Sequence, residues 1–344
     1  MPAVTFGMFD WIDRRAAPLH QIYEERLQLL EEADAGDLFC YHLAEHHATP
    51  LGTAPSPGVF LAAAAQRTRR IRLGPLVYLL PLYHPLRLIE EVCMLDHLSG
   101  GRLELGVGRG VSPYELGYHG VDVSLSREIF SEALAVLIAG LTSDRLNHVG
   151  EYYRFDDVPI EMQPLQRPYP PLWYATTNLE SVPWAAAQGL NLVGLGPAAA
   201  VRPNVDLYRR TWQEFQTEPG RLNGHVTAPR VGINRQIVIA DRDDEALAIA
   251  RAAHERWTAS FLALWHAHGD NRYDTFGNFD AALRAETIIA GSPDRVREQL
   301  ARLIAVSGCD YVILAFAWGS MTHSQSLRSL RLFMREVAPA FASD

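Results

Sequence analysis

Three short segments of the chain carry residues that could do chemistry. The first, residues 42–47 (HLAEHH), contains the spacing H-x-x-E-H of inverted zinc peptidases. That chemistry needs a helix, because histidines four residues apart must share one face to bind one ion. Here the preceding residues 38–41 are apolar and read as a strand, and Pro50 closes the segment. On a strand His42 and His46 are about 13 Å apart, at ~3.3 Å per residue, so we expect no metal site.

A strand that ends at residues 42–47 permits a different chemistry. Barrel enzymes keep their catalytic groups at the C-terminal ends of their strands, and a histidine there can take or give a proton near neutral pH. His46 and His47 point to opposite sides of an extended chain, so at most one of them faces a ligand. The alternative is a loop cluster in which Glu45 accepts a hydrogen bond from a neighbouring donor.

The second segment is residues 106–110 (GVGRG). Glycines let the backbone approach a bound group closely and leave amides free, and Arg109 could hold a phosphate with a forked pair of hydrogen bonds. The run does not match G-x-G-x-x-G, and no helix is expected immediately after it, so a Rossmann-type site is unsupported. A turn with a surface ion pair is the alternative.

The third segment is residues 176–181 (TTNLES), between a predicted strand and its helix. Asn178 and Ser181 can cap that helix. A phosphate at the helix N-terminus would use the same groups together with free backbone amides, so capping and phosphate binding are compatible. Arg109 from the neighbouring strand could converge on this loop, and this pairing favours a phosphate site.

The elements that must position these segments alternate between short apolar strands and amphipathic helices. This alternation, with eight strands, predicts a (β/α)8 TIM barrel with insertions, and the count favours closure over an open doubly wound sheet. Without an internal repeat or a low-complexity linker, residues 1–344 form a single domain. The expected strands are Val4–Met8, Leu38–His42, Ile71–Leu80, Arg102–Gly108, Leu172–Ala175, Leu192–Leu195, Val231–Ala240 and Tyr311–Ala317.

Two segments do not fit the alternation. Residues 148–156 (HVGEYYRFD) indicate a small hairpin or an extended excursion. Residues 265–285 are polar, contain glycine and are weakly periodic. Long loops of compact domains are often lids, so a lid or insertion is expected there, and a surface excursion without a catalytic part is the alternative.

Composition excludes several classes of protein. The net charge of −9 argues against a general nucleic-acid or anionic-membrane surface. No apolar run approaches the ~20 residues that span a membrane, and no signal peptide is visible at the N-terminus. The three cysteines, Cys40, Cys93 and Cys309, are scattered and indicate neither a disulfide framework nor a thiolate zinc site. A cytoplasmic enzyme is expected.

Taken in order, the motifs of this chain resemble those of the bacterial luciferase-like flavin-dependent monooxygenases. The resemblance covers most of the chain, and although each motif is unspecific, the ordered set is specific. The motifs are residues 6–9 (FGMF), 44–47 (AEHH), 80–85 (LPLYHP), 95–102 (LDHLSGGR), 108–110 (GRG), 181–186 (SVPWAA) and 291–293 (GSP).

The resemblance implies an enzyme that binds reduced FMN (FMNH2), supplied by a separate flavin reductase, and forms a C4a-hydroperoxyflavin with molecular oxygen. A small organic substrate is then oxygenated. It also implies a homodimer and a non-proline cis peptide near Leu76-Val77. His46 resembles the catalytic histidine that assists proton transfer. The implied FMN-phosphate contacts are the Arg109 side chain, the amides of Val111 and Thr177, and the polar side chains of Asn178 and Ser181.

This chain departs from the luciferase pattern at several points. Gly108 stands where luciferase has a cysteine, and Asn178 replaces the usual serine. Residues 265–285 are not clearly similar to the luciferase mobile loop, so light emission is not implied. Some relatives use a deazaflavin coenzyme, but their motifs differ from residues 44–47, which favours FMN. Two alternatives stay open: a flavin- or deazaflavin-dependent oxidoreductase without oxygen insertion, and a non-catalytic flavin-binding barrel.

Overall fold

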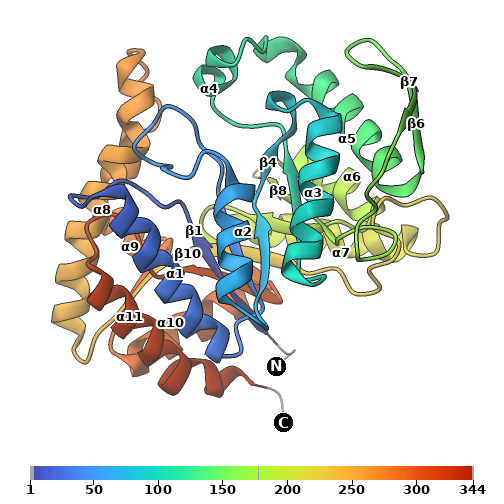
Figure 1. Cartoon of the computed structure of the whole chain (residues 1–344). Coiled ribbons are helices and arrows are strands. Elements are labelled where there is room, and N and C mark those ends of the chain that lie inside the picture. Colours follow the sequence, from blue (N-terminus) through green and yellow to red (C-terminus); the bar gives the residue numbers. More distant parts are fainter. Residues whose placement is uncertain (1–3, 177, 343–344) are drawn as a thin grey trace.

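The computed structural model describes residues 4–176 and 178–342, and its centre is a barrel of parallel strands (Figure 1). The strands pair in the order β3-β2-β1-β12-β10-β9-β8-β5-β4. The bounds are β1 (Thr5–Asp10), β2 (Cys40–Leu43), β3 (Arg72–Pro75), β4 (Tyr78–Leu79), β5 (Leu105–Gly108), β8 (Leu172–Thr176), β9 (Asn191–Gly194), β10 (Val231–Ile239) and β12 (Tyr311–Ala315).

The barrel closes between β3 and β5. A parallel bridge joins Leu73 to Leu103, next to the start of β5, and β4 pairs with the end of β5. Strands β3 and β4 are two halves of one predicted strand, separated by a cis peptide between Leu76 and Val77. The non-proline cis peptide expected from the resemblance is therefore present. All eight predicted barrel strands are found, with ends that differ by up to three residues from the expected bounds.

Glycines allow β3 and β5 to approach each other closely. A Cβ at Gly106 would overlap the carbonyl oxygen of Pro75, and a Cβ at Gly108 would overlap a methyl group of Val77. A cysteine at position 108 would therefore not fit without movement of the Val77 side chain. Glycine at position 108 avoids this overlap.

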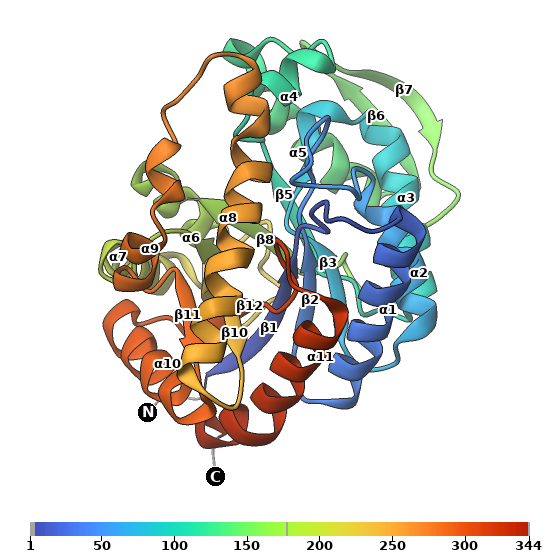
Figure 2. The same cartoon turned by 90° about the vertical axis from the view of Figure 1, so that its left-hand side faces the viewer.

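Helices surround the barrel on the outside, as Figures 1 and 2 show from two directions. Proline in the first turn starts α2, α3 and α10, and Gly100 ends α3 in the left-handed conformation at φ 66°. The surrounding helices are α1 (Leu19–Ala35), α2 (Pro57–Arg67), α3 (Pro85–Ser99), α5 (Ser126–Thr142), α6 (Val182–Ala187), α7 (Ala198–Phe215), α8 (Asp243–Ala267), α10 (Pro293–Ser307) and α11 (His323–Leu332).

Four further elements lie outside this pattern. The predicted hairpin is the antiparallel pair β6 (Arg145–Val149) and β7 (Arg154–Pro159). A short helix, α4 (Pro113–Tyr118), follows β5. Strand β11 (Ile288–Gly291), which was not expected, pairs in parallel with the second half of β10. No helix in the described part of the chain is long and apolar enough to cross a membrane.

The predicted lid segment 265–285 contains more regular structure than expected. It begins with the last turn of α8, continues through a 3-10 helix at Asp274–Gly277, and ends with α9 (Phe279–Arg284). Asn278 caps α9 by accepting a hydrogen bond from the amide of Ala281. The segment is thus an ordered excursion between α8 and β11.

Large side chains fill the barrel interior. Trp173 and Tyr311 are both fully buried, and their rings lie 5.2 Å apart. The indole of Trp173 donates to Glu104, which also pairs with Arg72. Because the interior is packed in this way, a ligand has to bind at an end of the barrel rather than inside it.

Candidate functional site

The imidazole of His46 lies just beyond β2 and is held by a carboxylate from α4. Its Nδ1 is 3.1 Å from Oε1 of Glu115, and the same oxygen accepts the backbone amide of His47 at 3.2 Å. The Glu115 side chain is 3% exposed, whereas that of His46 is 20% exposed. The ring is therefore anchored on its Nδ1 side by a buried acceptor and remains partly accessible.

The neighbouring His47 has a different carboxylate. Its Nε2 lies 2.7 Å from Oε1 of Glu45, whose Oε2 accepts from the Tyr83 hydroxyl at 2.9 Å and the Leu79 amide at 3.2 Å. Burial raises the pKa of Glu45, against the opposing effect of the hydrogen bond from His47. Glu45 thus accepts hydrogen bonds from neighbouring donors, as the loop-cluster alternative proposed. The rings of the two histidines are thus bound to different carboxylates.

The third histidine of the segment, His42, is part of the barrel core. It is fully buried, and its Nε2 lies 2.9 Å from the hydroxyl of Tyr311. Burial lowers the pKa of His42 to about 3, so the ring is neutral. His42 and His46 have different partners and do not form a shared site. Across residues 4–176 and 178–342, no group of three His, Cys, Asp or Glu side chains could hold a metal ion.

Arg109 and Val111 follow the end of β5 on the surface. Both are exposed, Val111 at 78%, and Gly110 between them turns the chain at φ 90°. Strand β5 pairs in parallel with β8, with Leu105 opposite Leu172. The loops that follow the two strands therefore start at neighbouring positions on one rim of the barrel. The sequence analysis predicted that the strands before Arg109 and before residues 176–181 are neighbours, and the pairing of β5 with β8 confirms this.

Side chains of the loop after β8 are bound mainly to one another. The hydroxyls of Thr176 and Ser181 lie 2.8 Å apart, and Ser181 also donates to the carbonyl of Asn178 at 2.9 Å. Asn178 caps the 3-10 helix Leu179–Ser181 by accepting from the amide of Glu180 at 2.9 Å. Capping by Asn178 is confirmed, whereas Ser181 makes no capping bond to α6. Thr177 lies outside the described residues.

Small side chains and aromatic rings lie at the same rim. Asp10 at the end of β1 turns outward to Arg26 of α1, so its neighbours Phe9 and Trp11 point the other way, and their rings meet edge to face at 4.8 Å. Phe9 packs in one apolar cluster with Ala44 at the end of β2. Ala44 lies two residues before His46 in the chain, so this apolar cluster reaches the end of β2.

Sequence reasoning missed Glu115, because no helix was expected immediately after residues 106–110. That expectation is wrong: α4 starts at Pro113, and Ser112 caps it by accepting from the amide of Glu115 at 3.3 Å. The pattern S-P-x-E at residues 112–115 carries the signal, since Ser, Pro and Glu are favoured at the N-cap, N1 and N3 positions.

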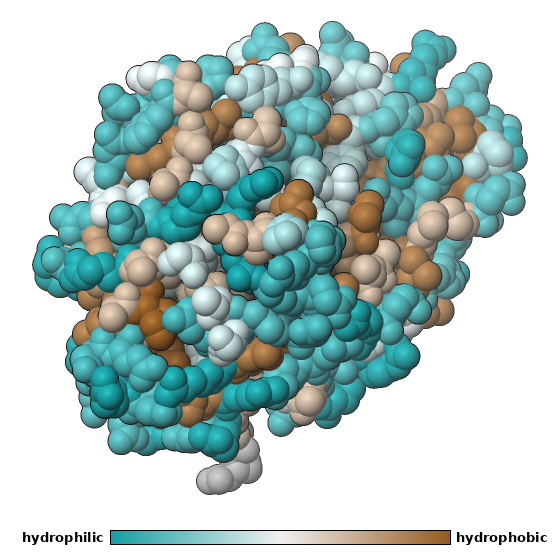
Figure 3. Space-filling model, turned by 60° about the vertical axis from the view of Figure 1, so that its left-hand side comes forward, coloured by the Kyte–Doolittle hydropathy of each residue, from teal (hydrophilic) through white to brown (hydrophobic). Residues whose placement is uncertain are grey.

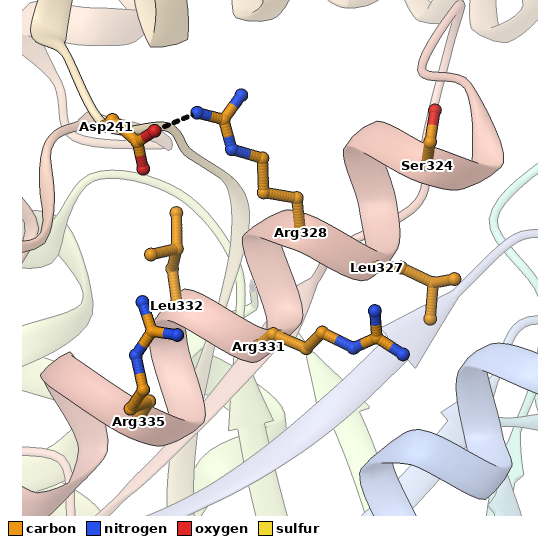
Figure 4. Close-up of a pocket in the computed structure, with 7 residues that line it drawn as sticks. All are labelled: Asp241, Ser324, Leu327, Arg328, Arg331, Leu332 and Arg335. Atoms are coloured by element: carbon orange, nitrogen blue, oxygen red, sulfur yellow. Dashed lines mark hydrogen bonds and ion pairs between the residues drawn. The ribbon is translucent and has the colours of Figure 1, made fainter.

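A surface pocket of about 360 Å³ lies elsewhere, along α11 (Figure 4). Arg328 and Arg331 are among its lining residues; Arg328 turns to Asp241 at the end of β10, and Arg331 pairs with Glu32. The face of the molecule drawn in Figure 3 is largely hydrophilic, with scattered apolar side chains. The pocket includes none of the predicted site residues.

Comparisons with known proteins agree with the barrel fold. A model of the luciferase-like monooxygenase family matches residues 4–310. The uncharacterised protein y4wF of Sinorhizobium fredii is 38% identical, over 97% of this chain and 96% of that protein. The oxygenase component of the flavin-dependent trigonelline monooxygenase of Acinetobacter baylyi is 27% identical, over 94% of this chain and 91% of that protein.

Among solved structures, the monooxygenase RslO1 from Streptomyces bottropensis superimposes with a TM-score of 0.87 at 27% identity, covering 98% of this chain and 100% of that one. Fold, ordered motifs and family match thus agree. The chain belongs to the luciferase-like monooxygenase family.

Proposed function

We propose that this protein is a flavin-dependent monooxygenase that uses reduced FMN and molecular oxygen to oxygenate a small organic substrate. The observation that carries the proposal is the placement of His46 at the end of β2, with its ring partly exposed and anchored by buried Glu115. A histidine so placed can transfer protons at a ligand bound on the barrel rim. Membership of the family supports the choice of redox chemistry over hydrolysis.

The residues after β5 and β8 fit the phosphate of FMN. Arg109 is exposed and follows the strand that pairs with β8, so its guanidinium can reach a phosphate placed between the two loops. The hydroxyl of Ser181 and the side chain of Asn178 lie in the second loop. The amides of Val111 and Thr177 complete the proposed set. A phosphate anchored there supplies binding energy away from the reacting ring of the flavin.

Bound reduced flavin would supply the electrons that activate oxygen. The chain's own part is to bind and orient the flavin, to keep water away and to move protons. Phe9 and Ala44 offer an apolar surface for the ring system, and Arg109 holds the opposite end of the cofactor. His46, with Nδ1 occupied by Glu115, has Nε2 free to exchange a proton with the ligand.

We propose that the end of α8 and the segment after it cover the barrel mouth. Two tyrosines of α4 hold this segment: the ring of Tyr114 stacks on His268 at 3.9 Å, and the hydroxyl of Tyr118 lies 2.7 Å from Nε2 of His268. Tyr114 also donates to Asp270 at 3.1 Å. Since α4 carries Glu115, the cover and the anchor of His46 belong to one unit. A cover of this kind would exclude water from the reacting face.

Two partners belong to the proposal. A separate reductase would deliver reduced FMN; the related trigonelline monooxygenase has an oxygenase component, which supports a system of more than one component. A second copy of the chain would pack against α2 and α3, which lie side by side and expose Val59 at 75%, Met94 at 53% and Leu98 at 45%. Such an apolar patch is typical of an interface. Sedimentation of the purified protein tests the dimer.

The function is tested by binding reduced FMN without oxygen and then admitting oxygen. Reoxidation of the flavin should be slower than for free flavin and should accelerate in His46→Ala, while flavin binding is retained. His20→Ala, which replaces an exposed histidine of α1, is the matched control and should behave as the parent. Reoxidation at the rate of free flavin would contradict a monooxygenase. Hydride transfer from a reduced cofactor in its place would favour an oxidoreductase without oxygen insertion.

A further inference from the structure

We propose that Glu115 is a positioning residue that fixes the tautomer of His46, with the proton on Nδ1 and the lone pair on Nε2. The inference deepens the proposed function and rests on it for its catalytic meaning. It assigns a role to a side chain that the motifs did not single out. The chemistry at the barrel mouth would then use one defined nitrogen of His46 as proton acceptor.

Two donors converge on a single oxygen of Glu115, and this determines which group donates. The backbone amide of His47 can only donate, and it lies 3.2 Å from Oε1. Oε1 therefore acts as an acceptor, and a hydrogen bond from the ring of His46, 3.1 Å from the same atom, requires a proton on Nδ1. In a neutral imidazole the other nitrogen, Nε2, then carries the lone pair.

The anchor itself is held rigidly. Glu115 occupies the first turn of α4, where its amide donates to the Ser112 cap, and the next residue, Leu116, is 3% exposed. On the other side of the histidine, a Cβ at Gly52 would come within 2.8 Å of the His46 Cβ, so the backbone there packs directly against the side chain. Neither partner can move away without repacking α4 or the loop after β2.

The other nearby carboxylate cannot take this role. Glu45 is already bonded to His47, Tyr83 and the amide of Leu79 through both of its oxygens. Among the described residues, Glu115 is the carboxylate within hydrogen-bond distance of His46. Glu115 thus pairs with the ring of His46 and Glu45 with the ring of His47, and among the described residues Nε2 of His46 has no hydrogen-bond partner.

The proton transfer that this arrangement permits is simple. When an O–H or N–H group of a ligand approaches, a bond forms between its proton and Nε2 of His46. The bond to the donor breaks, and its electron pair stays on the donor atom. The resulting positive ring lies against the carboxylate of Glu115, which stabilises it electrostatically, as a carboxylate behind a catalytic histidine does in other enzymes. Return of the proton restores the starting state.

The test reads the tautomer directly and needs no flavin. The protein is labelled with 15N-histidine, and side-chain nitrogen shifts are recorded at mildly alkaline pH, where imidazoles are neutral. A His46→Gln spectrum identifies the His46 signals. The parent should show a protonated Nδ1. In Glu115→Met, which keeps an unbranched side chain but removes the acceptor, most of the signal should move to the form protonated at Nε2.

Glu115→Gln is the matched variant, because the amide of His47 requires an oxygen at the same place and the amide oxygen can supply it. The Glu115→Gln variant should keep the proton on Nδ1 of His46. It also provides a second test if the Glu115→Met variant does not fold. A parent protonated at Nε2, or an unchanged tautomer in folded Glu115→Met, would overturn the proposal. So would a shifted tautomer in Glu115→Gln. If the tautomer behaves as expected but oxygen chemistry is absent, the proposed function fails alone.

Discussion

A buried cluster behind the end of β1 makes the stability of this protein depend on pH. Asp10 and Asp13 share one guanidinium, that of Arg26, at 2.8 and 3.7 Å. Burial raises the pKa of Asp13 to about 7, and the charge of Arg26 opposes this rise. Burial raises the pKa of Asp10 as well, and Asp10 is the closer partner of Arg26, so the two carboxylates compete for one cation. Two buried carboxylates that share one cation repel each other when both are charged, and this repulsion raises the free energy of the doubly charged state.

The magnitude follows from the two pKa values. The ordinary value for Asp13 is 3.8, and the folded value is about 7. Because the folded value is raised, the native state binds more protons than the unfolded chain between these limits. The stabilisation is complete below the lower value and is lost as the pH rises through the upper one. Between pH 5 and pH 8 the unfolding free energy should fall by roughly 2–3 kcal/mol through this group.

Asp13→Asn removes the titration but keeps an oxygen that can accept from the amide of Gly319, now 2.6 Å from Asp13. The unfolding free energy of both proteins is measured in urea at pH 5 and pH 8. Subtracting the pH-dependent change of the variant from that of the parent removes the contribution of other titrating groups near the cluster, such as His323. The parent should lose ~2–3 kcal/mol more than the variant over this interval. Asp156→Asn, at an exposed position of β7, should match the parent. Equal pH dependence of parent and Asp13→Asn would refute the reasoning.

Three further outcomes are expected. Arg109→Ala should weaken FMN binding by ~1–3 kcal/mol, the loss of charge-assisted hydrogen bonds, while the exposed Arg127→Ala should not; equal affinities in a fluorescence titration would make the phosphate assignment wrong. Gly106→Ala should lower the unfolding free energy by ~1–3 kcal/mol in urea, because its Cβ overlaps the Pro75 carbonyl; an unchanged midpoint would show that the strands can separate at no cost. His268→Ala should speed amide hydrogen exchange at the end of α8, and unchanged exchange there would argue against a cover held by α4.

Much of the barrel can be predicted from local pattern, because strands and helices depend mainly on neighbouring residues. Short apolar runs separated by amphipathic stretches predicted all eight barrel strands, and the β6–β7 hairpin was also expected. Pro85 at the start of α3 and Gly100 at its end are local signals of helix boundaries. Strand β11 was missed, since its four residues follow a polar segment and pair only with the far half of β10.

The candidate site, like the fold, has a part that the sequence predicts and a part that only the structure shows. Motif order indicated His46, Arg109 and residues 176–181, and parallel pairing of β5 with β8 explains why two of these segments share a rim. The partner of His46 could not be derived in this way, because Glu115 is 69 positions away and is brought to the imidazole by the folding of α4.

The same limit applies to charge. The residue types of Asp10, Asp13 and Arg26 are evident from the sequence, but their effect depends on burial. In water three such side chains would titrate near their ordinary values, whereas in the folded chain one cation serves two enclosed carboxylates. The local sequence pattern thus predicts the strands and helices, and the sequence itself contains the family motifs. Distances and exclusion of water, which arise only on folding, decide which nitrogen carries a proton and which acid stays neutral.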